Sequence, residues 1–263
     1  MIRLFVRAAA MFALPAMLAI IIACAFGGRS DPDLLLIQRH VDQRNVWTRQ
    51  LVLIDTERGM VAPLTRTPGL DVRASWSPDG ERIVFESMRD GKSEIYIMSA
   101  FGRHIRRMTH TADPFLSYMA RWSPDGANLA YYFRQGEFSA LFVLDSASGI
   151  ETRLSEYAVV TSAPSWSPDS TQLVFSLLFG PGAEVAVARI GGQSQRFIAS
   201  SPAYDTSPAW SPDGRWIAFL SDRETVFSSR LVPFLYEPET EHVRLLTSSP
   251  DVDYNALTWS PDG

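Results

Sequence analysis

The stretch Trp76-Ser77-Pro78-Asp79-Gly80 decides the fold, because the same pattern returns four more times along the chain. The other copies begin at Trp122, Trp166, Trp210 and Trp259, and the copy at Trp166 ends in serine instead of glycine. Neighbouring copies are about 44 to 49 residues apart, which is the length of a propeller blade and too long for a leucine-rich or ankyrin repeat. The sequence therefore predicts an all-β protein, a β-propeller of four-stranded antiparallel blades with five blades visible.

Each repeat carries further strand signals at fixed distances from its tryptophan. Apolar residues stand seven and nine positions after the first four tryptophans, as Ile83 and Phe85 do in the first copy, and this alternation predicts a strand buried on one face. A third strand is expected at residues 94–97, 141–144, 185–187 and 231–236. Shorter and more polar fourth strands, suited to an outer edge that resists pairing, are expected at residues 107–109, 153–155, 196–198 and 244–247.

The Ser-Pro-Asp-Gly part of the repeat predicts a type I β-turn. Serine stands at the first corner, proline fixes φ at the second, aspartate occupies the third and glycine leaves the turn. The repeated aspartates are therefore interpreted as turn residues, and because each stands alone in its repeat we expect no metal site. The tryptophans are expected to be buried between neighbouring blades, since one such ring buries about 150–250 Å².

These repeats resemble the TolB-like family, a WD-type β-propeller family whose blades carry P-x-W-S-P-D-G-x-x-I-x-F-x-S-x-R-D-G. The copy that begins at Trp76 matches this signature at residues 76–80, Ile83, Phe85, Ser87 and residues 89–91. The resemblance covers residues 34–263 and implies a propeller of that type.

The number of blades stays open. Before Trp76 there are three strand-like runs, at residues 34–37, 51–54 and 61–65, without a tryptophan strand to begin that blade. Residues 256–259 are able to supply it by pairing beside residues 34–37, which closes a ring of five blades and leaves no open edge. The alternative is a propeller of six or more blades that is truncated at Gly263.

Residues 1–26 predict a segment that targets the protein to a membrane. Arg3 and Arg7 precede the uncharged run 8–26, as in an export signal. Nineteen helical residues span about 28 Å, so an uncleaved anchor helix is one alternative, and a cleaved signal is another. In the third, the run ending at Cys24 resembles a bacterial lipobox, in which that cysteine is acylated.

The remaining chain is expected to be a flexible tether at residues 27–33 and a propeller at residues 34–263. The sequence thus predicts an exported protein at the periplasmic or extracellular face. It is tethered there through a lipidated Cys24 or the run 8–26.

Composition and motifs argue against several classes of function. The chain has 263 residues, a formal net charge of −5 and 46% apolar residues, so we expect a packed core and no nucleic-acid partner. A single cysteine, four scattered histidines and the lack of nucleophile-elbow, zinc-protease and phosphate-loop motifs predict no catalysis, no cofactor and no metal.

The predicted binding residues lie on loops at one mouth of the propeller channel, where tyrosine and arginine favour binding. They are Tyr118, Tyr204, Asp205, Tyr254, Arg73, Arg89, Arg134 and Arg223. A structural interpretation competes with this one, since Arg89 and Arg223 are able to pair with the neighbouring Asp90 and Asp222. The resulting hypothesis is a monomeric, non-catalytic scaffold that binds a protein or peptide partner in the cell envelope. A glycan-binding or glycan-cleaving propeller and an extracytoplasmic sensory domain remain as alternatives.

Overall fold

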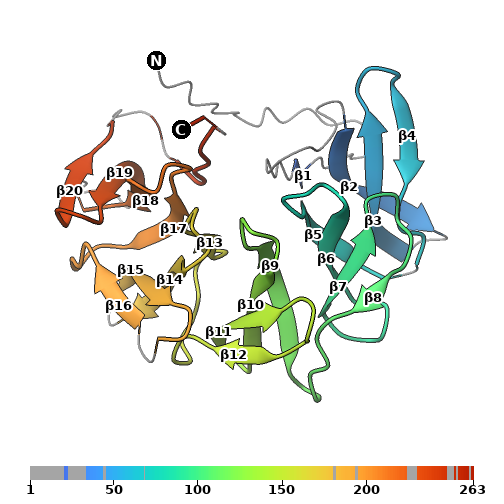
Figure 1. Cartoon of the computed structure of the whole chain (residues 1–263), viewed down its shortest axis with the longest axis horizontal. Coiled ribbons are helices and arrows are strands. Elements are labelled where there is room, and N and C mark those ends of the chain that lie inside the picture. The colour runs from blue at the N-terminus through green and yellow to red at the C-terminus, as the bar shows by residue number, and fades with distance from the viewer. Residues whose placement is uncertain are drawn as a thin grey trace. The chain divides into compact units, whose positions relative to one another are not determined.

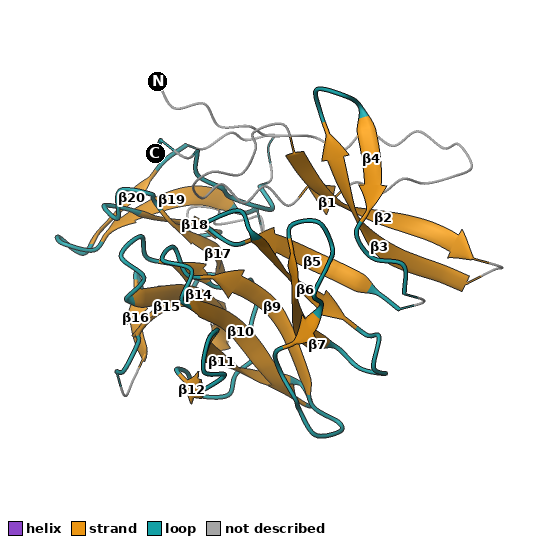
Figure 2. Ribbon diagram, turned by 45° about the vertical axis from the view of Figure 1, so that its right-hand side comes forward, coloured by secondary structure: helices purple, strands orange, loops and turns teal. Residues whose placement is uncertain are grey.

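The computed structural model describes residues 21–22, 34–43, 46–67, 69–179, 182–192, 195–223, 230–247, 252, 254–260 and 262–263. Every regular element in these ranges is a β-strand, as Figure 2 shows, so the all-β prediction is confirmed. The chain divides into two compact units, residues 1–122 (unit 1) and 123–263 (unit 2).

Unit 1 contains two four-stranded antiparallel sheets in consecutive order and one further strand (Figure 1). The first sheet consists of β1 (Ile21–Ile22), β2 (Leu34–Gln43), β3 (Val46–Asp55) and β4 (Met60–Pro63). The second consists of β5 (Asp71–Trp76), β6 (Arg82–Ser87), β7 (Glu94–Ser99) and β8 (Arg106–Arg107). The further strand is β9 (Leu116–Trp122).

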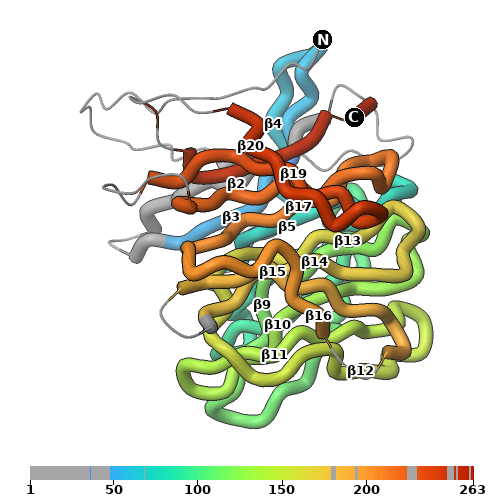
Figure 3. The backbone as a smooth tube through the Cα atoms, turned by 90° about the vertical axis from the view of Figure 1, so that its left-hand side faces the viewer, coloured from blue at the N-terminus to red at the C-terminus, as the bar shows by residue number. Residues whose placement is uncertain are grey.

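Unit 2 repeats this arrangement. Its first strands, β10 (Asn128–Gln135), β11 (Phe138–Asp145) and β12 (Glu151–Arg153), pair antiparallel in that order. The next sheet consists of β13 (Ser165–Trp166), β14 (Gln172–Phe179), β15 (Gly182–Arg189) and β16 (Gln195–Ile198). The last consists of β17 (Asp205–Trp210), β18 (Ile217–Ser221), β19 (Val232–Glu237) and β20 (His242–Leu245); Figure 3 follows it in orange and red.

The strand that follows each repeated turn, as β6 does, is buried on both faces. The prediction that buried and exposed residues alternate along this strand is therefore wrong. In β6, Ile83, Val84 and Phe85 are all fully buried and Glu86 is 2% exposed. The reason is that other strands of unit 1 pack against both faces of this sheet: β2 and β3 contact β5, and β9 contacts β6 and β7. A strand covered on both faces needs apolar residues at successive positions.

The repeated turn has the predicted geometry. The N–H of Gly80 donates to the carbonyl of Ser77 (2.9 Å), which closes the four-residue turn. The Ser77 hydroxyl donates to Asp79 Oδ1 (2.5 Å), and the same oxygen accepts the N–H of Glu81 (3.0 Å). Gly80 has φ +71°, the left-handed region that glycine adopts readily, and the serine that replaces glycine in one copy, Ser170, has φ +60°. The aspartates are therefore turn residues, as predicted.

We expect Ser211→Ala to destabilise the protein by about 1–2 kcal/mol, because the buried hydroxyl accepts the N–H of Trp216 and donates to Asp213. The pKa of the Asp213 carboxyl is held below its usual value, mainly by the hydrogen bond from Ser211 and also by one from the N–H of Arg215. A carboxylate of this kind contributes stability above its unfolded pKa of about 3.9 and loses it as the pH falls through the folded value. An NMR titration should therefore show the Asp213 pKa rising in the variant. Urea unfolding of Ser200→Ala, which removes an exposed hydroxyl bond, should show little change. An unchanged Asp213 pKa in Ser211→Ala would contradict the assignment.

The strand that ends in the repeat tryptophan, called the inner strand below, contains a bulge just before that tryptophan in two of the sheets. The pairing register shifts between Val72 and Ser75 in β5 and between Thr206 and Ala209 in β17. Arg73 (φ +50°), Met119 (φ +56°) and Ser207 (φ +53°), each three residues before a tryptophan, take the left-handed conformation there. The backbone at this position is thus the same in three repeats, although the side chains differ.

Residues 256–259, which supply the closing strand in one alternative, have no strand structure. Within unit 1, the edge of β2 pairs with β1, through Ile21 opposite Gln38 and Ile22 opposite Ile37. The indole N–H of Trp259 donates to the carbonyl of Ala209 (3.0 Å), so this tryptophan is held by side-chain contact to β17 and not by a strand ladder.

Most of the predicted membrane-targeting segment, residues 1–26, lies outside the described residues, and so do Cys24 and the expected tether 27–33. Within the part of the chain that the structure describes, no helix has the length and apolar character needed to cross a membrane.

Candidate binding surface

Arg89 is held inside unit 1 by its own sheet. Its guanidinium donates to Asp71 Oδ1 (3.2 Å) and to the Ser87 hydroxyl (2.8 Å), and it lies over the rings of Phe85 and Tyr96 at 5.1 and 4.9 Å. The Asp71 side chain is fully buried and that of Arg89 is 13% exposed. This residue therefore clamps the sheet and offers little surface to a ligand.

The same clamp recurs in unit 2. The guanidinium of Arg223 donates to Asp205 Oδ2 (2.7 Å) and to the Ser221 hydroxyl (3.0 Å), and it lies over Phe219 and Phe234 at 5.0 and 5.1 Å. Burial raises the pKa of the Asp205 carboxyl, against the opposing effect of Arg223. The Phe-x-Ser-x-Arg part of the repeat thus reaches back to an aspartate at the start of the inner strand.

The expected pairing with a neighbouring residue in the sequence, Asp90 for Arg89 and Asp222 for Arg223, is wrong for both arginines. Asp90 instead accepts the Tyr96 hydroxyl (2.5 Å), and Asp222 accepts the N–H of Tyr204 (2.8 Å). In both clamps the charged partner is instead an aspartate of the adjacent strand, Asp71 for Arg89 and Asp205 for Arg223.

Arg73 combines exposure with a buried partner. Its side chain is 49% exposed and donates to Glu86 Oε2 (2.8 Å), while the Glu86 side chain is 3% exposed. The other oxygen of Glu86 accepts the N–H of Met119 (2.7 Å). Burial raises the pKa of Glu86, although Arg73 acts in the opposite direction. This carboxyl links the side chain of Arg73 in β5 to the main chain of β9 at Met119.

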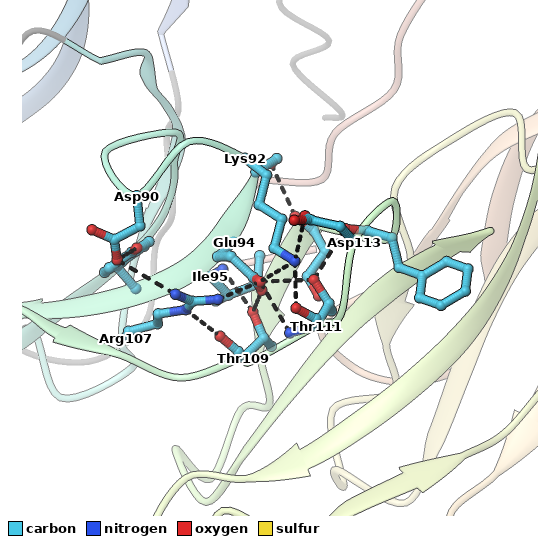
Figure 4. Close-up of polar contacts among 12 residues, drawn as sticks. Asp90, Lys92, Glu94, Ile95, Arg107, Thr109, Thr111 and Asp113 are labelled. Carbon is cyan, nitrogen blue, oxygen red and sulfur yellow. Dashed lines mark hydrogen bonds and ion pairs between the residues drawn. The ribbon is translucent and has the colours of Figure 1, made fainter. Parts of the chain in front are cut away.

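A buried glutamate of the same unit, Glu94, accepts hydrogen bonds near the loops at residues 88–93 and 110–115 (Figure 4). The sequence did not predict a role for it. Glu94 is fully buried and accepts the guanidinium of Arg107 (2.6 Å) and the hydroxyls of Thr109 (2.5 Å) and Thr111 (2.7 Å). One sequence signal points to part of this network. A hydroxyl after the fourth strand accepts an N–H of the third in three sheets, through Thr65, Thr109 and Ser155.

Lys92 joins the loop at residues 88–93 to the loop at residues 110–115. Figure 4 shows its amine between the carboxyls of Glu94 and Asp113, at 3.9 and 3.0 Å, and it also donates to the carbonyl of Thr111. The Asp113 side chain is 89% exposed. The polar groups of these two loops are therefore largely engaged with one another.

The loop end of unit 2 is different, because it exposes apolar and aromatic side chains. Phe138, Leu178 and Tyr204 are 53%, 41% and 37% exposed. We call these three residues, together with the half-buried Tyr157, the apolar rim.

Backbone pairing brings the members of the apolar rim together. Ser139, next to Phe138, exchanges two hydrogen bonds with Ala158, next to Tyr157. The N–H of Leu178 donates to the carbonyl of Val159 (2.7 Å). Ala183 is the register partner of both Leu178 and Tyr204. Register partners point to the same face of a sheet, so Leu178 and Tyr204 flank the buried Ala183 on one face.

The other predicted binding residues are placed as follows. Arg134 donates to the carbonyl of Gly136 in its own hairpin (2.8 Å). Tyr254 packs on the core cluster of the last sheet, and its N–H donates to the carbonyl of Leu231 (3.2 Å). Tyr118 is a half-buried residue of β9 in unit 1. Of the eight predicted residues, the apolar rim includes Tyr204.

Among the described residues, no group of three histidine, cysteine, aspartate or glutamate side chains has the arrangement of a metal site. The buried carboxyls described above are engaged with arginine, hydroxyl or backbone donors. The chemistry that the described loops offer is therefore apolar contact in unit 2 and an internal polar network in unit 1.

Comparison with known proteins gives a consistent result. Residues 111–263 match the family model of the TolB beta propeller domain. Among solved structures, a protein assigned as TolB from Agrobacterium tumefaciens is 23% identical with a TM-score of 0.64, over 89% of this chain and 82% of that one.

Two enzymes also share the fold. An oligogalacturonate lyase from Vibrio parahaemolyticus is 14% identical with a TM-score of 0.65, over 85% of this chain and 68% of that one. A puromycin-hydrolysing peptidase from Mycobacterium tuberculosis is 14% identical with a TM-score of 0.65, and this chain spans 38% of its length. Similarity at this level of identity concerns the fold and not the activity.

Proposed function

Because the chain belongs to the TolB beta propeller domain family, we propose that it is a non-catalytic binding protein of the cell envelope. It captures a protein or peptide partner through the apolar rim of unit 2. The observation that carries this proposal is the exposure of Phe138, Leu178 and Tyr204 in segments of unit 2 that are linked by backbone pairing through residues 158–159 and Ala183.

The chemistry of the rim favours a protein or peptide partner. Interface cores are rich in aromatic and apolar side chains and poor in charge, and a few aromatic residues contribute most of the binding free energy. Arg89, Arg223 and Asp205, in contrast, are engaged in the internal clamps. They support the surface by holding the sheets and do not form it.

Export and tethering belong to the same proposal. Arg3, Arg7 and the apolar run 8–26 direct the chain out of the cytoplasm, and acylation of Cys24 anchors it, with residues 27–33 as the tether. Two or more acyl chains, at about 0.8 kcal/mol per buried CH₂, hold a protein stably on a membrane. Processing before Cys24 removes β1 and leaves β2 to β4 as the first sheet.

The decisive experiment is photo-crosslinking in cells, with a photoreactive phenylalanine analogue at position 138 or 204 of the full chain. We expect one protein adduct, common to both positions and identified by mass spectrometry. The combined Phe138→Ala and Tyr204→Ala variant should then bind that partner at least tenfold more weakly, because about 1.4 kcal/mol of lost contact free energy is a factor of ten.

The matched control is Ile150→Ala, which removes an apolar side chain that is 67% exposed at another loop of unit 2. It should leave capture unchanged. Adducts to envelope polysaccharide alone from a folded protein would refute the proposal in favour of the glycan-binding alternative. A rim variant that captures the partner as well as the parent does would also refute it.

A further inference from the structure

The turn between β7 and β8 in unit 1 exposes apolar and basic side chains together. Phe101 is 71% exposed and Ile105 is 40% exposed. Arg103, which stands between them, and Arg106, which follows them, are exposed as well. We call residues 101–106 the basic turn.

Main-chain contacts fix the start of the basic turn. The N–H of Gly102 donates to the carbonyl of Ser99 (2.9 Å), and the N–H of Ser99 donates to the carbonyl of Arg103 (2.8 Å). Gly102 has φ +76° and lies so close to the first sheet that a Cβ there would be 2.7 Å from the Leu64 carbonyl oxygen. The exposed ring of Phe101 is therefore presented on a backbone of defined conformation.

The repeat itself does not require an aromatic residue at this place. Phe101 stands two positions after the end of a third strand, and the equivalent residues of the other four sheets are Glu57, Ala147, Gly191 and Glu239. The loops between the third and fourth strands of those sheets have no excess of basic over acidic residues; they are residues 56–59, 146–150, 190–194 and 238–241. The combination of an exposed phenylalanine with arginines is therefore specific to the second sheet, and turn geometry does not explain it.

Charge is distributed unequally between the two units. Unit 1 contains 16 lysine and arginine residues and 12 aspartate and glutamate residues, whereas unit 2 contains 8 and 17. The basic turn contains no acidic residue. Glu81 contacts the residue before it, since its carbonyl accepts the N–H of Ala100 (2.8 Å), so two exposed arginines stand against one glutamate. An anionic surface is thus attracted to unit 1 and repelled by unit 2.

We propose that the basic turn docks on the surface of an anionic phospholipid bilayer. Phe101 and Ile105 enter the boundary between headgroups and acyl chains, where aromatic and aliphatic side chains of peripheral proteins lie. Arg103 and Arg106 lie at the level of the lipid phosphates, since a guanidinium binds phosphate oxygens well. Two apolar and two basic side chains give a weak contact, which becomes lasting only in a protein that is already held at the membrane.

The place where the chain enters the fold supplies that condition, and here the inference rests on the export and tethering in the proposed function. Strand β2 begins at Leu34 in unit 1, directly after the proposed tether at residues 27–33. Seven residues span at most about 25 Å, so the tether keeps the start of unit 1 within that distance of the bilayer. The basic unit is therefore the one that the anchor brings to the lipid.

The test is photo-crosslinking of the purified full chain in vesicles of phosphatidylglycerol and phosphatidylcholine in equal parts. A photoreactive phenylalanine analogue at position 101 should give lipid adducts, detected by mass spectrometry. In vesicles of phosphatidylcholine alone their yield should fall at least tenfold. The combined Arg103→Glu and Arg106→Glu variant should lower it to the same extent in the anionic vesicles, because basic side chains near the surface supply the attraction. Flotation with the uncharged vesicles measures attachment through the N-terminus separately.

Unit 2 supplies the matched controls. Ile150, 67% exposed in the equivalent loop, should give at most a tenth of the lipid adducts when it carries the photoreactive group. Reversal of two exposed arginines of outer strands, Arg153→Glu with Arg196→Glu, should leave the adducts of position 101 unchanged. Circular dichroism should show every variant folded.

Three results would overturn the inference: equal lipid adducts from positions 101 and 150, a yield that ignores lipid charge, or a yield that survives reversal of Arg103 and Arg106. Adducts from position 101 to a second copy of the chain without lipid adducts would also overturn it. The vesicles contain no partner protein. Loss of partner capture at the apolar rim with lipid contact intact would therefore refute the proposed binding role and leave this inference standing.

Discussion

Arg223→Ala should lower the free energy of unfolding by about 3–5 kcal/mol, although arginine is usually a surface residue. The substitution leaves the Asp205 carboxyl, which is fully buried, without its 2.7 Å partner. It also removes the planar group that lies over Phe219 and Phe234. Urea unfolding followed by tryptophan fluorescence measures the loss.

The matched control is the Arg196–Glu241 pair, which has the same kind of contact (2.8 Å) with side chains 56% and 68% exposed. Arg196→Ala should cost at most about 1 kcal/mol, because water screens an exposed pair. Equal losses at Arg196 and Arg223 would show that burial of the aspartate is not the cause.

The deficit of Arg223→Ala should also depend on pH. Burial already raises the pKa of Asp205, and removal of the guanidinium raises it further. A carboxyl whose folded pKa lies above the unfolded value favours folding once it is protonated, so its penalty grows as the pH rises through the folded pKa. The variant should therefore approach the parent in stability as the pH falls from 7 toward about 4. A deficit that is constant with pH would contradict this account.

Trp122→Ala should be similarly damaging, with a loss of about 3–5 kcal/mol. Trp122 is 7% exposed, and the guanidinium of Arg82 lies 4.5 Å from its ring centre. Truncation removes a large apolar area and leaves a cavity that the surrounding strands fill only in part. Thermal and urea unfolding give the magnitude.

For comparison, Ile150→Ala removes an apolar side chain that is 67% exposed, and its effect should stay within about 0.5 kcal/mol. If Trp122→Ala were equally mild, the tryptophan of the repeat would not be a packing residue.

The repeated motif was sufficient to predict the local fold because each of its residues has a geometric task of its own. Proline and glycine dictate the turn, serine and aspartate close it, and Trp76, Trp122 and Trp166 are each 7% exposed. These local roles can be predicted from the sequence of a single repeat. The burial of both faces of β6 could not be predicted in this way, because it depends on strands distant in the sequence.

The site was less predictable because its contacts also join residues distant in the sequence. Arg89 and Arg223 were predicted as binding residues, but each pairs with an aspartate 18 residues earlier, on an adjacent strand. Asp71 and Asp205 both stand five positions before a tryptophan, a signal that aligning the repeats would have revealed. Glu94 has a counterpart in Glu184, since each stands 18 positions after a tryptophan, but the partners of Glu94 depend on which loops the sheet brings together.

The left-handed bulge before the tryptophan has a consequence for how such a chain can diversify. Arginine, methionine and serine occupy it at positions 73, 119 and 207 with nearly the same φ. The position is thus defined by main-chain geometry and is permissive toward side-chain identity. At this position in three repeats, the side chain can therefore change in sequence while the backbone of the sheet keeps its conformation.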